Sequence, residues 1–229
     1  MAAFRLLLAC VEPLYDTAVF EHSLYLVPPF RRAEALRYRH VRDRCLSLAA
    51  ALLLTLAARH DGLAVDALHF TKSVYGKPLC VERPDWHFNL SRSGSLAVCF
   101  SGPCALGVDV QVLKDMPHCS FDAWLHASEK AWLTQWGHVY PEILARLWTR
   151  KEAFLKAVGA GFSIDPAAVS VLQGQAPLWQ GQSYHFEEYS LSGHALAVCL
   201  PRGRAFPPLQ HMDMRDVVSS LSARAGSAA

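Results

Sequence analysis

The sequence predicts an α+β protein built from two similar halves, because one hairpin pattern occurs twice and helix-forming sequence precedes each copy. The segments SRSGSLAVCF (91–100) and SLSGHALAVCL (190–200) share Ser-x-Ser-Gly followed by Leu-Ala-Val-Cys, with one residue inserted in the second. Each follows a strand-like run, WHFNL (86–90) or YHFEEYSL (184–191), so each predicts a hairpin into a buried strand. We expect the halves to be related by a pseudo-two-fold axis, with a ligand cleft between them.

The expected elements follow in chain order. LLLAC (6–10) is shorter than the roughly 7–15 apolar residues of a signal peptide, so it predicts a first core strand. The basic run RYRHVRDR (37–44) leads into LSLAAALLLTLAA (46–58), which predicts one long helix over 31–59 with a charged beginning and a buried end. That apolar run is shorter than the about 20 residues that span a bilayer.

The second half contains two further helix-forming segments, 120–136 and 142–158. The halves meet near SGPCALGVDVQVL (101–113), so we divide the chain into residues 1–105 and residues 106–218. The small, polar segment SSLSARAGSAA (219–229) predicts a disordered tail.

The composition excludes several classes of protein. A net charge of +2, from 22 basic and 20 acidic residues, is too small for a general nucleic-acid coat. The seven cysteines are odd in number and contain no C-x-x-C pair, which indicates reduced residues of a cytoplasmic protein rather than a disulfide framework or a zinc site. The eleven histidines contain no H-E-x-x-H motif. We expect no membrane or nucleic-acid partner.

The helix LWTRKEAFLKAV (147–158) has an unusual apolar face. At about 100° per residue, its large apolar side chains form one stripe, and Lys151 points into the middle of that stripe. Glu152 lies at the edge of the stripe, and Lys156 follows it at i+4. A buried ammonium is costly without an anionic partner, so this helix predicts an anion nearby.

Four other segments carry candidate functional side chains. YGKP (75–78) presents Lys77 in a turn between Gly76 and Pro78, and FNLSRSG (88–94) contributes polar groups at a strand end. GVDVQ (107–111) alternates, so Asp109 and Gln111 share the face opposite the two valines. The remaining candidates are Asn89, Ser91 and Arg92 in the second segment and, in the first helix, Arg31, Arg32, Arg37, Arg39, Arg42 and Arg44.

Each segment also has an ordinary structural interpretation. An arginine run is commonly a solvated helix face, and G-K-P is commonly only a turn. An aspartate between valines often forms a salt bridge, and Glu152 with Lys156 is compatible with a routine i,i+4 pair. No single segment is specific; their combination and order are.

In that order, YGKP, FNLSRSG, GVDVQ and WTRKEAFLK resemble the 4′-phosphopantetheinyl transferases of the surfactin-synthetase-activating (Sfp) type. The family pattern is G-K-P, F-N-[IL]-S-H-S-G, G-[IV]-D-[IV]-E and W-x-x-K-E-[AS]-x-x-K. The resemblance covers residues 31 to 165, and the tandem halves extend it to residue 200.

The resemblance implies an activity and a set of ligands. Such enzymes bind coenzyme A between their halves with Mg²⁺ (or Mn²⁺), and transfer its 4′-phosphopantetheine arm to a serine of an apo acyl, peptidyl or aryl carrier protein, releasing 3′,5′-ADP. Asp109, Glu152 and Gln111 would hold the metal, and Glu152, Asp109 and Lys156 would be catalytic. The coenzyme A ligands would be Gly76, Lys77, Pro78, Asn89, Ser91, Arg92, Lys151, Lys156, Arg31, Arg39 and Arg42.

Two residues depart from the family pattern. Position 111 is glutamine where many relatives have glutamate, and position 92 is arginine where histidine is usual. These departures keep open a degenerate member that binds coenzyme A or carrier protein without catalysis. A metal-dependent nuclease using Asp109 and Glu152 is a further alternative, disfavoured because the lysines flank Glu152 on a helix and the net charge is low. Because both halves lie in one chain, we expect a monomer.

Overall fold

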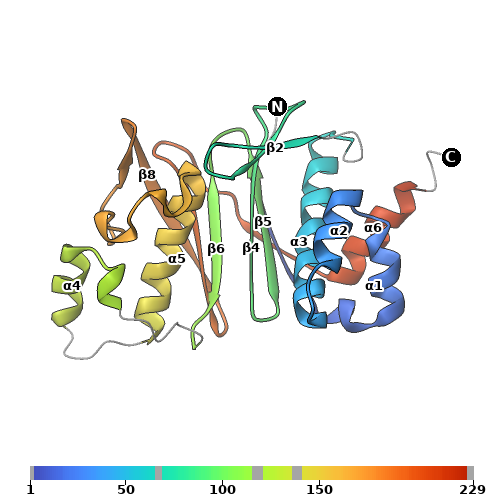
Figure 1. Cartoon of the computed structure of the whole chain (residues 1–229), viewed down its shortest axis with the longest axis horizontal. Coiled ribbons are helices and arrows are strands. Elements are labelled where there is room, and N and C mark those ends of the chain that lie inside the picture. Colours follow the sequence, from blue (N-terminus) through green and yellow to red (C-terminus); the bar gives the residue numbers. More distant parts are fainter. Residues whose placement is uncertain (1–2, 65–68, 115–120, 136–140, 226–229) are drawn as a thin grey trace. The chain divides into compact units, whose positions relative to one another are not determined.

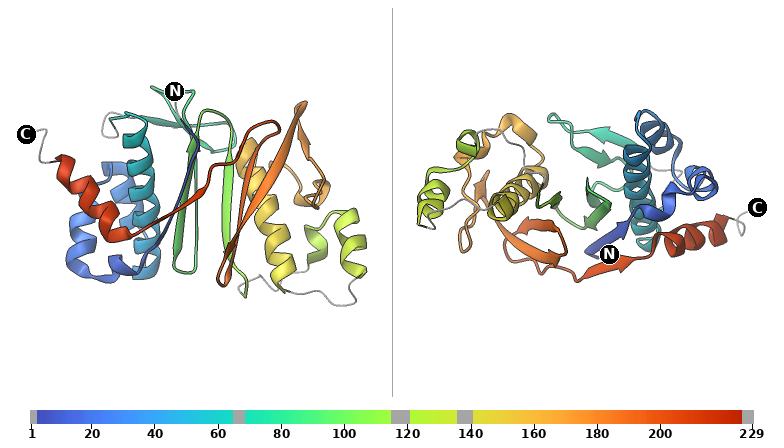
Figure 2. Two further views of the ribbon diagram at one scale, coloured as in Figure 1. Left: turned by 180° about the vertical axis from the view of Figure 1, so that it is seen from behind. Right: turned by 90° about the horizontal axis from the view of Figure 1, so that it is seen from below.

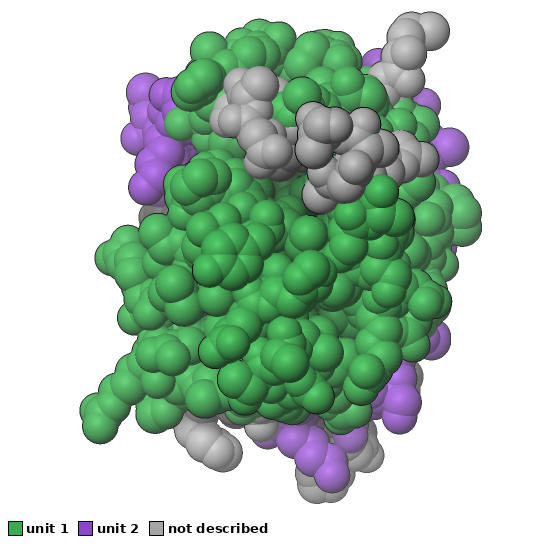
Figure 3. All heavy atoms as spheres, turned by 90° about the vertical axis from the view of Figure 1, so that its right-hand side faces the viewer, with its two compact units in different colours: residues 1–70, 80–103, 207–229 green, residues 71–79, 104–206 purple. Residues whose placement is uncertain are grey.

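The computed structural model describes residues 3–64, 69–114, 121–135 and 141–225. The chain forms two compact units, coloured separately in Figure 3. Unit 1 comprises Met1–Phe70, Cys80–Pro103 and Pro207–Ala229, and unit 2 comprises Thr71–Leu79 and Cys104–Phe206. Both units combine helices with a sheet, which confirms the predicted α+β class. The chain passes from unit 1 to unit 2 after residue 103, whereas the division expected from the sequence lies after residue 105. Residues 71–79 and 207–218 each belong to the unit opposite to the one expected from chain order.

Unit 1 is built on a four-stranded sheet with the order β10-β1-β5-β4. Its strands are β1 (Arg5–Cys10), β4 (His87–Ser93), β5 (Leu96–Gly102) and β10 (Leu209–Met212). Strand β5 runs antiparallel to both β1 and β4, whereas β10 lies parallel to β1. The predicted first core strand at residues 6–10 and the first predicted hairpin, β4–β5, are therefore confirmed.

The helices of unit 1 are α1 (Thr17–Leu24), α2 (Pro29–Leu36), α3 (Val41–His60) and α6 (Met214–Ala225). Helix α3 packs on β1, β4 and β5, and it lies beside α1, α2 and α6 in Figures 1 and 2. Every residue of α3 from Cys45 to Ala58 is buried. The predicted buried half of a long helix is therefore confirmed.

The prediction of one continuous helix over 31–59 is wrong, because the chain leaves the helix between α2 and α3. His40 is extended, with φ −88° and ψ 138°. The Arg44 guanidinium donates to the Tyr38 carbonyl at 2.7 Å. This side-chain bond satisfies a carbonyl that the helical ladder would otherwise use.

The prediction of a disordered tail over 219–229 is wrong for residues 219–225, which complete α6. Met214, Val217 and Leu221 are buried at helical spacing, so a short apolar stripe lies within a largely polar sequence. The Arg59 guanidinium also donates to the Leu221 carbonyl at 2.8 Å. Residues 226–229 lie outside the described part of the chain.

Unit 2 contains a second four-stranded sheet, with the order β6-β9-β8-β7. Its strands are β6 (Gly107–Val112), β7 (Leu178–Trp179), β8 (Gln182–Leu191) and β9 (His194–Pro201). Helix α5 (Pro141–Val158) packs on β6 and β9, and α4 (Ala127–Thr134) precedes it. The hairpin β8–β9 confirms the second predicted hairpin, and α5 confirms the helix predicted over 142–158. Between β2 (Phe70–Lys72) and β3 (Pro78–Cys80) lies the predicted Y-G-K-P turn.

No described helix combines the length and apolar character needed to cross a bilayer. The six cysteines within the described residues are free thiols, and four of them are buried. Cys119 lies outside the described residues.

Candidate active site

The start of strand β6 allows helix α5 to lie directly against it. A Cβ atom at Gly107 would lie 2.0 Å from the Ala153 carbonyl oxygen and 2.5 Å from the Ala157 nitrogen, so only glycine fits here. Val108 and Val110 are fully buried, as the alternating pattern predicts. This close contact brings Asp109 of β6 to the side chains of the last turns of α5.

Asp109, Glu152 and Lys156 form one charged cluster. The Lys156 ammonium donates to Asp109 Oδ1 at 2.6 Å, and the exposed fractions of the two side chains are 28% and 8%. Burial raises the pKa of Glu152 above its ordinary value; nearby Lys156 opposes this rise, and nearby Asp109 adds to it. The structure therefore brings together two carboxylates and one ammonium from the segments GVDVQ and WTRKEAFLK.

Gln111 follows Asp109 by two residues on β6 and lies on the same face of the strand. Its side chain is half-buried. Its amide oxygen is a neutral ligand of the kind that hard cations bind. The glutamate of the family pattern would add one negative charge at this position.

Lys151 is paired inside unit 2. Its side chain is 1% exposed, and its ammonium lies 2.8 Å from Oε2 of Glu129, which is fully buried. The same ammonium donates to the carbonyls of Pro166, at 2.8 Å, and of Val169. The predicted anion near Lys151 is thus a protein carboxylate, and this environment does not fit a phosphate ligand.

Sequence reasoning missed Glu129, although a local signal was present. Glu129 is the third residue of α4, and its carboxylate accepts from the backbone N–H of His126 at 2.8 Å, completing a capping box. Its other oxygen accepts from the Val171 N–H at 2.8 Å. One buried carboxylate therefore joins the start of α4, the segment near residue 171 and α5.

Lys77 ends on backbone carbonyls. Its ammonium donates to the carbonyls of Lys156 at 2.7 Å, Ala157 at 2.9 Å and Leu106 at 3.1 Å. Burial lowers the pKa of this ammonium to about 8. Its stem packs against Gly159, whose φ of +74° ends α5 and where a Cβ would lie 2.9 Å from Lys77 Cδ. Lys77 thus fastens the end of α5 to the residue before β6.

A second cationic group lies in unit 1, at the turn of the hairpin β4–β5. The Arg92 guanidinium donates to the Tyr38 hydroxyl and lies 4.9 Å from the centre of its ring. The Arg42 guanidinium donates to the Gly94 carbonyl at 3.1 Å, and Arg44 binds the Tyr38 carbonyl. Sequence reasoning missed Tyr38, whose position inside the basic run was the only available signal.

The other predicted ligands of unit 1 have separate environments. Arg31 pairs with Glu34 at 2.8 Å, and its guanidinium lies 5.2 Å from the centre of the Phe30 ring. Arg39 is exposed, in the segment between α2 and α3. On β4, Asn89 is half-buried and Ser91 is buried. In unit 2, Gly76 forms the turn with a φ of +87°, and Pro78 begins β3.

Comparison with known proteins identifies the family of the chain. The family model described as the 4′-phosphopantetheinyl transferase superfamily matches residues 105–199, which contain β6 and α5. The 4′-phosphopantetheinyl transferase Sfp of Bacillus subtilis (strain 168) is 26% identical over 198 residues, covering 78% of this chain and 84% of that protein. The 4′-phosphopantetheinyl transferase psf-1 of Bacillus pumilus is 26% identical over 201 residues, covering 84% and 86%.

A fungal relative extends the similarity. The 4′-phosphopantetheinyl transferase pptA of Paxillus involutus is 31% identical over 180 residues, covering 66% of this chain and 68% of that protein. The chain belongs to the 4′-phosphopantetheinyl transferase superfamily. Within that superfamily it is a transferase of the Sfp type, as the order of its motifs predicted.

Proposed function

We propose that this transferase moves the 4′-phosphopantetheine arm of coenzyme A to a serine hydroxyl of an apo acyl, peptidyl or aryl carrier protein, with Mg²⁺ as cofactor and 3′,5′-ADP as second product. The observation that carries the proposal is the cluster of Asp109, Lys156 and Glu152 where β6 meets α5. Transfer of a phosphoryl-type group depends mainly on alignment and on neutralising charge at the phosphate oxygens. A cluster of two carboxylates and a lysine supplies groups for both tasks.

The donor set of this cluster fits a hard divalent cation. Mg²⁺ binds oxygen ligands, commonly one or two carboxylates together with substrate phosphate and water. Asp109 and Glu152 would supply the carboxylates, and the Gln111 amide oxygen a neutral ligand. The short bond from Lys156 to Asp109 supports this assignment, since this carboxylate already favours a cation. When bound, Mg²⁺ (or Mn²⁺) would neutralise negative charge on the pyrophosphate oxygens.

The side chains have distinct proposed roles. Glu152 accepts the proton of the incoming serine hydroxyl, directly or through one water, and its raised pKa suits a proton acceptor. The serine oxygen forms a bond to the β-phosphorus of coenzyme A, and the bond from that phosphorus to the bridging oxygen breaks, so 3′,5′-ADP leaves. Lys156, with its partly exposed ammonium, holds a phosphate oxygen.

We revise two of the predicted coenzyme A contacts. Lys151 is left out, because its ammonium is buried on Glu129. Lys77 becomes a positioning residue, because it fastens α5 to the segment before β6. Arg92 and Arg42 are the favoured phosphate ligands of unit 1. Four statements stay predictions: the binding of one coenzyme A by residues of both units, the monomeric state, the cytoplasmic location, and the contacts from Gly76, Pro78, Asn89, Ser91, Arg31 and Arg39.

Intact mass measurement tests the proposal. Apo carrier proteins of the acyl, peptidyl and aryl classes are incubated with the enzyme, coenzyme A and Mg²⁺. The expected result is a gain of one phosphopantetheine on at least one carrier, and a rate lower by about 10²-fold or more for Glu152→Gln. The matched control is Glu142→Gln, an exposed glutamate in the first turn of the same helix, which should keep the wild-type rate.

The degenerate alternative rests on Gln111, which removes one carboxylate from the proposed metal ligands. It predicts that coenzyme A binds in calorimetry while no carrier of the panel gains mass. That combination would contradict the proposed transfer.

A further inference from the structure

Strand β8 has an open edge. Strand β9 pairs with β8 along its length, from Tyr184 opposite Pro201 to Leu191 opposite His194. On the other side, the short strand β7 pairs only with residues 182 and 183. Beyond Tyr184, no other described strand pairs with this side of β8.

Two hydrogen bonds fix which backbone groups point to the open edge. The Ser183 carbonyl accepts from the Arg202 N–H at 2.8 Å, so the groups of Ser183 face β9. The Tyr184 N–H donates in the opposite direction, to the Pro177 carbonyl at 2.9 Å. The register to Leu191 is unbroken, so the N–H and C=O groups of Phe186, Glu188 and Ser190 also point away from β9, at intervals of about 7 Å.

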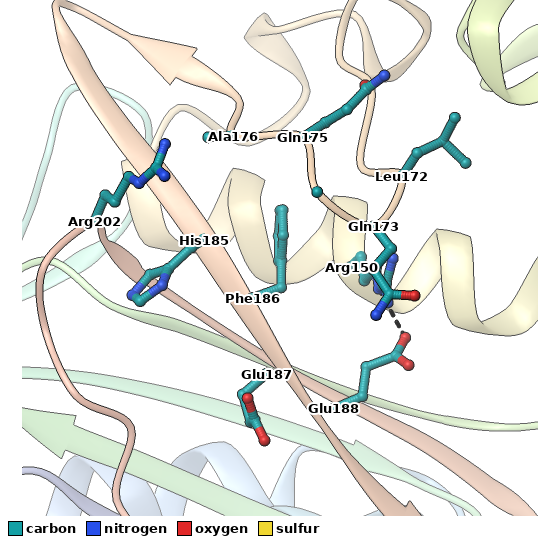
Figure 4. A pocket seen from close by; sticks show the side chains of 11 residues that line it. Arg150, Leu172, Gln173, Gln175, Ala176, His185, Phe186, Glu187, Glu188 and Arg202 are labelled. Atoms are coloured by element: carbon teal, nitrogen blue, oxygen red, sulfur yellow. Dashed lines mark hydrogen bonds and ion pairs between the residues drawn. The ribbon is translucent and has the colours of Figure 1, made fainter.

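A groove follows this edge (Figure 4). A cavity of about 430 Å³ lies between β8, from His185 to Glu188, and the segment 172–176, with Arg150 of α5 also lining it. A second cavity of about 310 Å³ shares Arg150, Leu172 and Glu188 and extends towards Trp132. Each volume lies within the range of known ligand sites.

The far wall of the groove is held away from β8. The Val171 carbonyl accepts from Arg150 at 2.9 Å, and the Val171 N–H donates to buried Glu129. Gly174 has a φ of +82°, so this segment turns and cannot run as a neighbouring strand. The cavity of about 430 Å³ therefore lies between the edge of β8 and a segment that does not pair with it as a strand.

The charges of the groove favour an acidic occupant. Arg146, Arg150 and Arg202 line it against only two carboxylates, those of Glu187 and Glu188. Glu188 is shared by Arg150 at 2.8 Å and Arg146 at 3.5 Å. Three guanidinium groups against two carboxylates leave an excess of one positive charge in the groove, and Arg202 is exposed to an incoming ligand.

We propose that the open edge of β8, at Phe186, Glu188 and Ser190, binds an extended acidic peptide segment of a partner protein as an added strand. Backbone hydrogen bonds supply the affinity in such strand addition, and side-chain pockets supply the selectivity. The groove uses a different face of α5 from the active-site cluster: Arg146 and Arg150 lie about 120° around the helix axis from Glu152 and Lys156. Strand addition is therefore separate from phosphopantetheine transfer.

The test uses the full ¹⁵N-labelled chain and a pool of capped hexapeptides that alternate threonine and valine, with one aspartate at each of the six positions in turn. Binding should shift the amide resonances of Phe186, Glu188 and Ser190 and slow their hydrogen exchange. N-methylation of the peptide amides that face β8 should weaken binding at least tenfold, whereas N-methylation of the alternate amides should leave it unchanged. This comparison leaves the protein unaltered.

Two protein variants complete the test. Ser190→Pro removes one edge N–H and should weaken binding, while Ser190→Ala keeps that N–H and should bind as the wild type does. Arg202→Gln should reduce the preference for the aspartate peptides over otherwise identical peptides in which asparagine replaces the aspartate. Three results would overturn the proposal: no binding by any peptide at millimolar concentration, equal binding by both methylated forms, or edge shifts that depend on protein concentration alone, which would indicate a second copy of the chain.

Discussion

Replacement of Lys151 by methionine separates a structural lysine from a ligand-binding one. The methionine side chain is of similar length but leaves the Glu129 carboxylate, which is fully buried, without its ammonium partner. Glu129 keeps two backbone donors, from His126 and Val171, while the carbonyls of Pro166 and Val169 each lose the bond from Lys151. Breaking one side of a buried ion pair costs about 3–5 kcal/mol, so we expect a loss of that size.

Urea unfolding measures this loss. With a slope of about 2 kcal/mol per molar urea, the midpoint should fall by roughly 1.5–2.5 M. The matched control is Lys130→Met in α4, whose side chain is 40% exposed; this change should alter the free energy of unfolding by less than about 0.5 kcal/mol. The additional change Glu129→Gln should recover part of the loss, because a neutral amide is less costly to bury. An unchanged midpoint, together with a tenfold higher KM for coenzyme A, would refute the reasoning and return Lys151 to the binding site.

Three further predictions concern the site around α5. Burial lowers the pKa of Lys77 from 10.5 to about 8. Between these pH values the unfolded chain binds more protons than the folded chain, so the stability of the wild type should rise with pH by about 3 kcal/mol relative to Lys77→Met. Parallel curves of stability against pH for the two proteins would contradict this. Glu152→Gln should stabilise the free enzyme at neutral pH while it lowers turnover, because burial of the charged carboxylate is unfavourable and raises its pKa. Thermal unfolding measures the stability and the mass assay measures the turnover. A less stable variant would count against the assignment. Gln111→Glu should tighten Mg²⁺ binding to the free enzyme in calorimetry without abolishing transfer, and unchanged metal affinity would mean that position 111 does not face the metal.

The features that the sequence predicted correctly are those determined by local pattern. The repeated hairpin, the valine alternation around Asp109 and the apolar stripe of α5 each lie within one segment, so periodicity alone identifies them. The stripe also showed that Lys151 needed an anionic partner. It could not show which anion, because Glu129 reaches Lys151 only through the packing of α4 and the segment near residue 171 on α5.

The incorrect predictions concern features that depend on individual side-chain contacts rather than on local pattern. At the break before α3, His40 is extended and the Arg44 side chain bonds the Tyr38 carbonyl, and composition reveals neither feature. The last segment consists mostly of small and polar residues, so its composition did not indicate that Leu221 is fully buried in the core of unit 1. The role of Lys77 follows from three carbonyls contributed by two other segments, so a G-K-P motif by itself could not distinguish a phosphate ligand from a helix fastener.

The parallel pairing of β1 with β10 has a consequence for biosynthesis. Leu6 pairs with Leu209, so the sheet of unit 1 gains its last strand only when nearly all of the described chain has left the ribosome. Unit 2 needs residues only up to Phe206 and can close earlier. Contacts between such distant residues form slowly, because a long loop must close first. A nascent chain therefore carries β1 with both edges unpaired until β5 is made and with one edge unpaired until β10 is made, and we expect chaperone binding and misfolding to concentrate there.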